Sequence, residues 1–180
     1  MTSWTLPRVA VIDGEEYAIH ADFRDVLEII GYLEDVSQPE FLRWHVALAL
    51  FYQRMPPVQP GMEYLCSFLR GGGQEIAPGP KLLDWQQDAS AIVSDINRVA
   101  GQEIRALPFV HWWTFLGWFH AIGQGQLSVL VGIRDKLRRG KKLEAWEQEF
   151  YRENRQRVTL HKRRSPEETA QMARLEQLLG

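Results

Sequence analysis

Apolar residues recur every three or four positions along most of the chain, which is the spacing of one face of an α-helix. The densest apolar stretch is 107–122, where large side chains cover nearly the whole circumference of a helix. A helix that is apolar all round is normally buried, so the pattern predicts a central core helix with Trp112, Leu116 and Phe119 inside. A helix partly reserved for a partner is the alternative. The other predicted helices span 22–35, 37–52, 61–69, 81–100, 127–137, 141–157 and 165–180.

Near the N-terminus the hydrophobic pattern has a different period. Asp13 and Gly14 stand between two short alternating runs within 9–20, the pattern typical of a two-residue β-hairpin turn. Asp22 is placed to cap the first helix, Ser37 to Glu40 has the spacing of a capping box, and Gly101 is placed to end the helix 81–100. The predicted fold is mainly α: a compact helical domain with a small N-terminal β-hairpin and a basic helical C-terminal arm.

No Asp, Glu, Lys or Arg occurs between Arg105 and Arg134. A membrane-spanning helix needs about 20 predominantly apolar residues, and the stretch 123–126, Gly-Gln-Gly-Gln, divides this run into two pieces that are each too short. We therefore expect no membrane span.

The bulk composition is that of a soluble globular protein, with 45% hydrophobic and 24% charged residues in 180. The length allows one main core. A single cysteine, Cys66, excludes an internal disulfide. Because the N-terminus carries no signal peptide or lipidation motif, we expect a reducing cytoplasm.

Charge is distributed unevenly. Residues 1–133 contain 8 Lys and Arg against 15 Asp and Glu, residues 134–164 contain 12 against 5, and residues 165–180 contain 1 against 3. This contrast predicts a helical body over 1–133 and a basic arm over 134–180, either separate or part of the same domain. A basic segment of this kind is a solvated helical face by default, and otherwise a surface for an acidic protein or for phosphates.

The sequence carries no motif of a known catalytic or metal centre. The histidines are scattered, and the glycines at 71–73 lack the Gly-Lys-Ser/Thr of a phosphate-binding loop. We therefore expect no enzymatic activity, no metal and no cofactor. Arg134 ends the long uncharged run, and a partly buried cation needs a carboxylate. The sequence thus predicts that Arg134 lies beside Asp84 and Asp88, which share a helical face.

Nucleic acid is a rival partner, because residues 138–142 and 152–164 are rich in Lys and Arg. Single-strand binding, however, needs exposed aromatic platforms beside the charges. Leu143, Trp146 and Phe150 recur at helical spacing and are predicted to form an inward stripe, so nucleic acid is the less favoured partner.

Three sequence elements together resemble a known family. They are the segment Asp84-Trp-Gln-Gln-Asp-Ala89, the segment His111-Trp-Trp-Thr-Phe115 and the pair Ile133-Arg134, with a further similarity over 140–151. The combination resembles the bacteriophage "gene product fifteen" family, found in the tail gene clusters of long-tailed phages and of prophages of Gram-positive bacteria. The family-motif residues are Asp84, Asp88, His111, Trp112, Trp113, Phe115 and Arg134, and the hydrophobic pattern indicates that they are mostly structural.

The resemblance implies a tail-assembly protein acting as a chaperone in the host cytoplasm during virion assembly. Such a protein coats the tape measure protein in many copies and delivers tail-tube subunits. It implies no enzymatic site. A structural tail component and a nucleic-acid-binding phage protein remain alternatives.

We expect the basic arm to bind an acidic or amphipathic protein partner, or to clasp a neighbouring subunit in a homo-oligomer. Removal of 134–180 is then expected to leave a folded body. The residues proposed for partner binding are Arg138, Arg139, Lys141, Lys142, Trp146, Phe150 and Tyr151.

Overall fold

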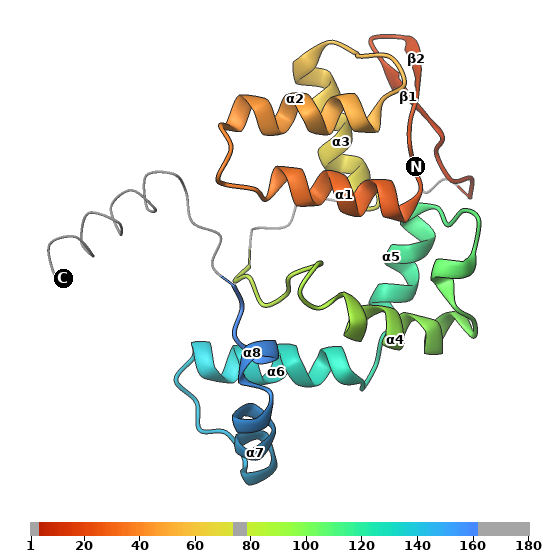
Figure 1. Cartoon of the computed structure of the whole chain (residues 1–180). Helices are drawn as coiled ribbons and strands as arrows, with labels where there is room; N and C mark the ends of the chain where they lie inside the picture. The colour runs from red at the N-terminus through yellow and green to blue at the C-terminus, as the bar shows by residue number, and fades with distance from the viewer. Residues whose placement is uncertain (1–3, 74–78, 162–180) are drawn as a thin grey trace, which may run out of the picture. The chain divides into compact units, whose positions relative to one another are not determined.

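The computed structural model describes residues 4–73 and 79–161. Over these residues the chain is mainly helical, with eight α-helices, one 3-10 helix and one two-stranded antiparallel sheet at the N-terminus, so the predicted fold class is confirmed (Figure 1). The chain divides into two compact units. The described residues of unit 1 are 4–73, and those of unit 2 are 79–161.

Unit 1 begins with the predicted hairpin, formed by β1 (Val9–Ile12) and β2 (Glu15–Ala18). Asp13 and Gly14 at its turn have φ values of 52° and 83°, and two consecutive positive φ values are what a type I′ turn requires. The hairpin prediction is therefore confirmed.

Three helices complete unit 1: α1 (Phe23–Leu33), α2 (Glu40–Phe51) and α3 (Val58–Leu69). Helices α1 and α2 lie side by side, and α3 packs against α2 and β1. Phe51 and Phe68 are fully buried with ring centroids 5.0 Å apart, and the hydroxyl of Tyr52 donates to the carbonyl of Gly61 at 2.9 Å. Burial of these aromatic rings provides much of the core of unit 1.

The two helix starts predicted in unit 1 have different outcomes. Asp22 caps α1, because its carboxylate accepts from the Arg24 amide at 3.0 Å. The capping box at Ser37 was a wrong prediction: Pro39 is the N-cap residue of α2, and it makes no side-chain cap bond. The Ser37 hydroxyl instead donates to Asp35 at 2.6 Å, since that carboxylate is two residues away and satisfies the hydroxyl within the loop.

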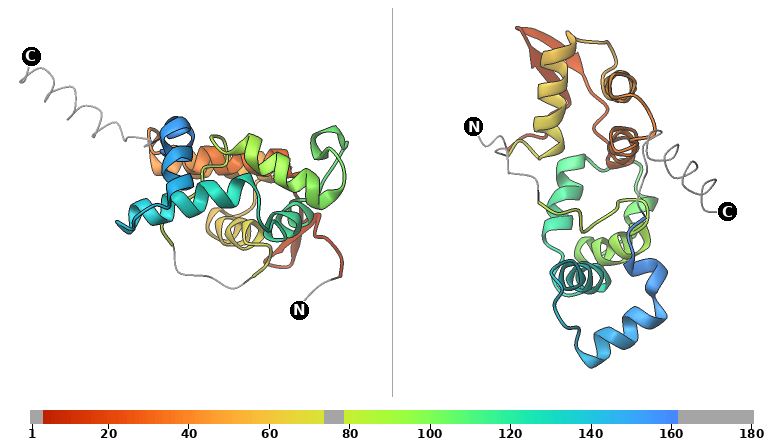
Figure 2. Two further views of the ribbon diagram at one scale, coloured as in Figure 1. Left: turned by 90° about the horizontal axis from the view of Figure 1, so that it is seen from below. Right: turned by 90° about the vertical axis from the view of Figure 1, so that its left-hand side faces the viewer.

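Unit 2 contains α4 (Ala89–Ala100), the 3-10 helix η1 (Ile104–Ala106), α5 (Trp112–His120), α6 (Gln126–Arg138), α7 (Ala145–Glu153) and the short α8 (Arg155–Val158). Helix α4 packs against α5 and α6, and α8 packs against α6 and α7. In the right-hand view of Figure 2, α6 is seen end-on, with α4 beside it and α7 below. As expected, Gly101 ends α4 in the left-handed conformation.

The apolar stretch 107–122 forms a shorter and less buried helix than its sequence predicts. Trp112 and Phe115 are buried, whereas Leu116 and Phe119 are only half-buried and Gly117 is exposed. The predicted burial is thus confirmed for Trp112 and wrong for Leu116 and Phe119. Within unit 2, α5 packs mainly against α4, and one neighbouring helix cannot cover every face of an apolar helix.

The predicted boundary between body and arm at 133/134 falls inside α6, and 134–161 belong to unit 2 together with 79–133. Leu143 and Val158 are buried there. Charge describes what faces the solvent, whereas a compact unit is defined by its buried contacts, so the charge boundary and the unit boundary differ. Removal of 134–180 would take away part of the core of unit 2, and we now expect it to unfold that unit.

The predicted terminal helix 165–180 lies outside the described residues. Among the residues that are described, no helix has the length and apolar character needed to cross a membrane.

Candidate functional site

The Arg134 side chain lies at the centre of a buried hydrogen-bond network in unit 2. Its Nη1 and Nη2 donate to the two carboxylate oxygens of Asp88 at 2.6 and 2.8 Å. The remaining donor bonds go to the carbonyls of Leu82 (3.0 Å), Arg157 (2.6 Å) and Val158 (2.7 Å). An arginine has five N–H groups, and all five are used. Of the two carboxylates predicted to lie beside Arg134, Asp84 and Asp88, the pairing is confirmed for Asp88.

The carboxylates of this network lie in a turn and not on a helix. Helix α4 begins at Ala89, so the predicted helix 81–100 starts eight residues late. The Asp84 side chain accepts from the backbone amides of Gln86 and Gln87 at 3.0 and 2.9 Å, and the Asp88 carboxylate accepts from the Asp84 amide at 3.0 Å. Local bonds of this type compete with helix formation, which explains the late start.

The turn 84–88 also binds the C-terminal segment of unit 2, residues 156–161. The Gln87 side-chain nitrogen donates to the carbonyls of Gln156, Arg157 and Thr159, and its oxygen accepts from the amide of His161 at 3.0 Å. Segments more than 65 residues apart are thereby joined by one side chain. The network fixes α8 against the rest of the unit.

The His-Trp-Trp element is likewise structural in its geometry. Nδ1 of His111 accepts from the amide of Trp113 at 3.0 Å and caps α5. Trp112 and Phe115 stack with centroids 5.4 Å apart, and the Trp85 ring packs edge-on against Trp112 at 5.9 Å. His111, Trp112 and Phe115 are buried, while Trp113 is half-buried. These side chains connect α5 to the turn that precedes α4.

A helix cap that the sequence did not reveal fixes the start of α6. The Asp95 carboxylate, on α4, accepts from the amides of Gln126 (3.3 Å) and Leu127 (2.9 Å). A Cβ atom at Gly125 would collide with this carboxylate, so only glycine fits there. Because Asp95 is some thirty residues from the helix it caps, no local pattern could have identified its role.

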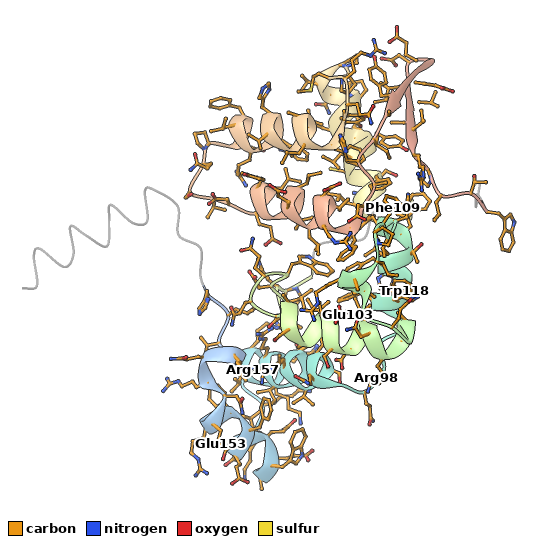
Figure 3. All side chains as sticks on the ribbon, turned by 45° about the vertical axis from the view of Figure 1, so that its right-hand side comes forward. Arg98, Glu103, Phe109, Trp118, Glu153 and Arg157 are labelled. Carbon is orange, nitrogen blue, oxygen red and sulfur yellow. The ribbon has the colours of Figure 1, made fainter. Side chains whose placement is uncertain are left out.

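Next to this cap, unit 2 contains an open groove of about 560 Å³. We call it the α6–α8 groove. Val129 of α6 and Trp146 and Phe150 of α7 form its apolar part, and Arg157, labelled in Figure 3, contributes a cation from α8. Its complete lining is Gln124, Gly125, Gln126, Val129, Trp146, Phe150 and Arg157.

The predicted inward stripe on α7 is wrong at Trp146. The Trp146 side chain is 52% exposed, whereas the next residue, Glu147, is buried. The Glu147 carboxylate accepts from the Lys136 ammonium at 2.7 Å and from the Glu144 amide at 2.8 Å. The bond from Lys136 lowers the pKa of Glu147, and it raises the pKa of Lys136. A charged pair therefore sets the rotation of α7, and the indole turns outward.

The other residues proposed for partner binding are not gathered at the groove. Arg138 and Arg139 form ion pairs with Asp135, each at 2.9 Å. Lys141 and Lys142 are exposed, and no ion pair of theirs occurs within 79–161. Tyr151 is half-buried. Only Trp146 and Phe150 line the groove.

No group of three His, Cys, Asp or Glu side chains in the described parts of the chain could hold a metal ion. No protein-family model, no curated protein and no solved structure matches the chain. Fold and site together define a mainly helical protein in two compact units, with a buried ion-pair network beside an open apolar groove.

Proposed function

We propose that this protein is a phage tail-assembly protein, a non-enzymatic chaperone that binds the tape measure protein and helps to recruit tail-tube subunits. The proposal is carried by the position of the motif residues. Asp88, His111, Trp112 and Arg134 are buried and hydrogen-bonded or stacked among themselves and their neighbours. Side chains held in this way stabilise the fold, and this supports a role in binding over a role in catalysis.

One surface of unit 2 has the chemistry of a protein-binding site. Arg138 and Arg139 at the end of α6, followed by the exposed Lys141 and Lys142, form a cluster of cations that we call the basic loop. A surface charge of one sign attracts a partner of the other sign over long range and raises the association rate. An acidic or amphipathic helical segment, such as a tape measure protein would present repeatedly, fits this surface.

The chemistry near Trp146 favours protein over nucleic acid. The exposed indole removes the sequence-based argument that no stacking platform is available. Its Nε1, however, donates to the Glu144 carboxylate at 3.0 Å, and α7 also carries Glu149 and Glu153. Carboxylates beside the aromatic ring repel a phosphate backbone.

Co-expression with the tape measure protein of the same phage tests the proposal. The double variant Lys141→Glu/Lys142→Glu should retain about one tenth or less of the tape measure protein that co-purifies with the original chain, because both attractive charges become repulsive. The control, Arg70→Glu/Arg155→Glu, changes the net charge equally at two exposed arginines that form no ion pair within the described residues, and it should bind as the original does. Equal binding by both double variants would refute the role of the basic loop.

The same purified proteins distinguish the chaperone from the two alternative functions. Binding to random-sequence DNA that is as tight as binding to the tape measure protein, and that weakens steeply with salt, would favour a nucleic-acid-binding protein. Recovery of the chain in stoichiometric amounts from purified mature tails would favour a structural tail component. The chaperone proposal predicts weak DNA binding and loss of the chain before maturation.

A further inference from the structure

The α6–α8 groove has the form of a receptor for a projecting apolar side chain. Its volume of about 560 Å³ lies within the range of roughly 300–1,000 Å³ typical of protein binding pockets. Its walls are held in place without any occupant. The Asp95 carboxylate fixes Gly125 and the start of α6, and the Glu144 carboxylate orients the Trp146 indole at 3.0 Å. Little ordering is needed to fill a groove prepared in this way.

The connection between α1 and α2, in unit 1, has the opposite shape. Four large apolar side chains on this connection and the adjoining helix turns are exposed, and we call them the α1–α2 tip: Tyr32, Val36, Phe41 and Leu42. Phe41 is 76% exposed, so its ring projects into solvent from the first turn of α2. Clustered exposed apolar side chains of this kind mark interaction sites.

The tip is also held in shape. The Arg43 guanidinium donates to the carbonyl of Leu33 at 2.6 Å and ties the start of α2 to the end of α1. The Ser37 amide and hydroxyl both donate to Asp35, at 3.1 and 2.6 Å. The apolar side chains are therefore presented by a preorganised turn.

The two surfaces have opposite charge. The chain around the tip carries Glu34, Asp35 and Glu40. In contrast, among the described residues the one charged side chain in the lining of the groove is the cation Arg157. At the groove itself the Arg157 guanidinium contacts a neutral partner, the Gln126 side-chain oxygen at 3.3 Å, and forms no ion pair within 79–161. Opposite charges on a projecting and a hollow surface guide the two together.

We propose that the α1–α2 tip of one copy of this protein docks into the α6–α8 groove of a second copy, with Phe41 as the anchor beside Trp146 and Phe150. Both halves of the interface are present in every chain, and they match in shape, in apolar character and in charge. This self-association does not depend on the identity of the tape measure protein, and it leaves the basic loop accessible.

The contact is heterologous, because the two surfaces that meet are different. After a single contact one copy still has a free groove and the other still has a free tip, so association continues until a ring closes or a filament grows. Repetition of one contact in this way would place many copies along an elongated partner at regular intervals.

Sedimentation velocity of the full chain over a concentration series tests the proposal. The original chain should form concentration-dependent assemblies that weaken as salt is raised. Phe41→Ser and Trp146→Ser should each weaken self-association by about 30-fold or more, as truncation of an interface hot spot does. Both side chains are exposed, so circular dichroism and melting temperature should stay unchanged. Trp4→Ser and Val58→Ser, which also truncate exposed apolar side chains, are the matched controls and should assemble normally.

Mixing the two defective variants gives the decisive result. Phe41→Ser keeps an intact groove and Trp146→Ser keeps an intact tip, so the mixture can form one productive contact and should yield a 1:1 heterodimer that grows no further. A chain that stays monomeric at every concentration would overturn the proposal, as would docking of tip and groove within one chain, which produces no dimer. Failure of the two variants to associate when mixed would equally overturn it.

Discussion

Replacement of Arg134 by methionine should be among the most destabilising single changes in unit 2. Methionine fills similar space but donates no hydrogen bond. The Asp88 carboxylate, 2% exposed, would lose its ion pair, and breaking a buried pair from one side costs about 3–5 kcal/mol. The buried carbonyl of Val158 would lose its donor, at about 1–3 kcal/mol. Carbonyls of Leu82 and Arg157 are partly accessible to water and add less.

The expected loss is therefore about 4–8 kcal/mol, which approaches the whole stability of many small domains. Arg134→Lys keeps the charge, but three donors on one nitrogen cannot replace a planar fork with five. It should cost less than methionine and more than a surface substitution. In a double-mutant cycle with Asp88→Asn, the double variant should lose less stability than the sum of the two single losses, because both substitutions act on one ion pair.

Equilibrium unfolding in urea, followed by tryptophan fluorescence, measures these losses. The signal reports mainly on unit 2, because five of the seven tryptophans lie there: Trp85, Trp112, Trp113, Trp118 and Trp146. Far-UV circular dichroism follows both units and would reveal a second transition from unit 1. A loss below about 1 kcal/mol for Arg134→Met would refute the reasoning, because it would mean that the carboxylate is solvated without its partner.

Three further predictions concern the same unit. Gly125→Ala should destabilise it by about 1–3 kcal/mol, because the new Cβ collides with the carboxylate that caps α6. The control is Gly132→Ala in α6, where a Cβ meets nothing within 4 Å, and it should stabilise the unit by about 0.5–1 kcal/mol. Equal urea midpoints for the two variants would contradict this prediction. The pKa of Glu147 is lowered from 4.5, so its pair with Lys136 contributes stability above pH 4.5 that is lost as the pH falls through the lowered value. In Glu147→Gln the acid loss of stability should be smaller, and an unchanged pH profile would exclude the pair as its cause. His111→Ala should cost about 1 kcal/mol through loss of the α5 cap, and His111→Asn, which retains an acceptor, should cost less by thermal melting; indistinguishable melting temperatures would argue against a capping role.

The features predicted correctly from the sequence depend on residues close together in the chain. The hairpin turn needs two residues that tolerate positive φ, and Asp13 and Gly14 supply them. The Asp22 cap and the Gly101 helix end are equally local. The pairing of Arg134 was also predicted correctly, although its partner is distant in the chain, because a cation at the end of a long uncharged run requires a buried carboxylate. The contacts of its other donors with three carbonyls had no sequence signal.

The α6–α8 groove could be predicted only in part. Phe150 and Trp146 were identified by their helical spacing, but the spacing placed both inside, because a periodic pattern states which residues share a face and not what covers that face. Arg157, Val129 and Gly125 were missed as groove residues, since they come from other segments of unit 2.

By itself, then, the sequence determined the helical class, the hairpin, several helix ends and the need of Arg134 for a carboxylate. Those outcomes follow from backbone preferences and desolvation costs that act within a few residues or on a single side chain. Only the tertiary structure decided that Asp95 caps α6, that Glu147 turns inward while Trp146 turns outward, and that residues 134–161 complete a compact unit. Each of these depends on which distant segment packs alongside, and a hydrogen bond between residues some thirty positions apart leaves no periodic trace in the chain.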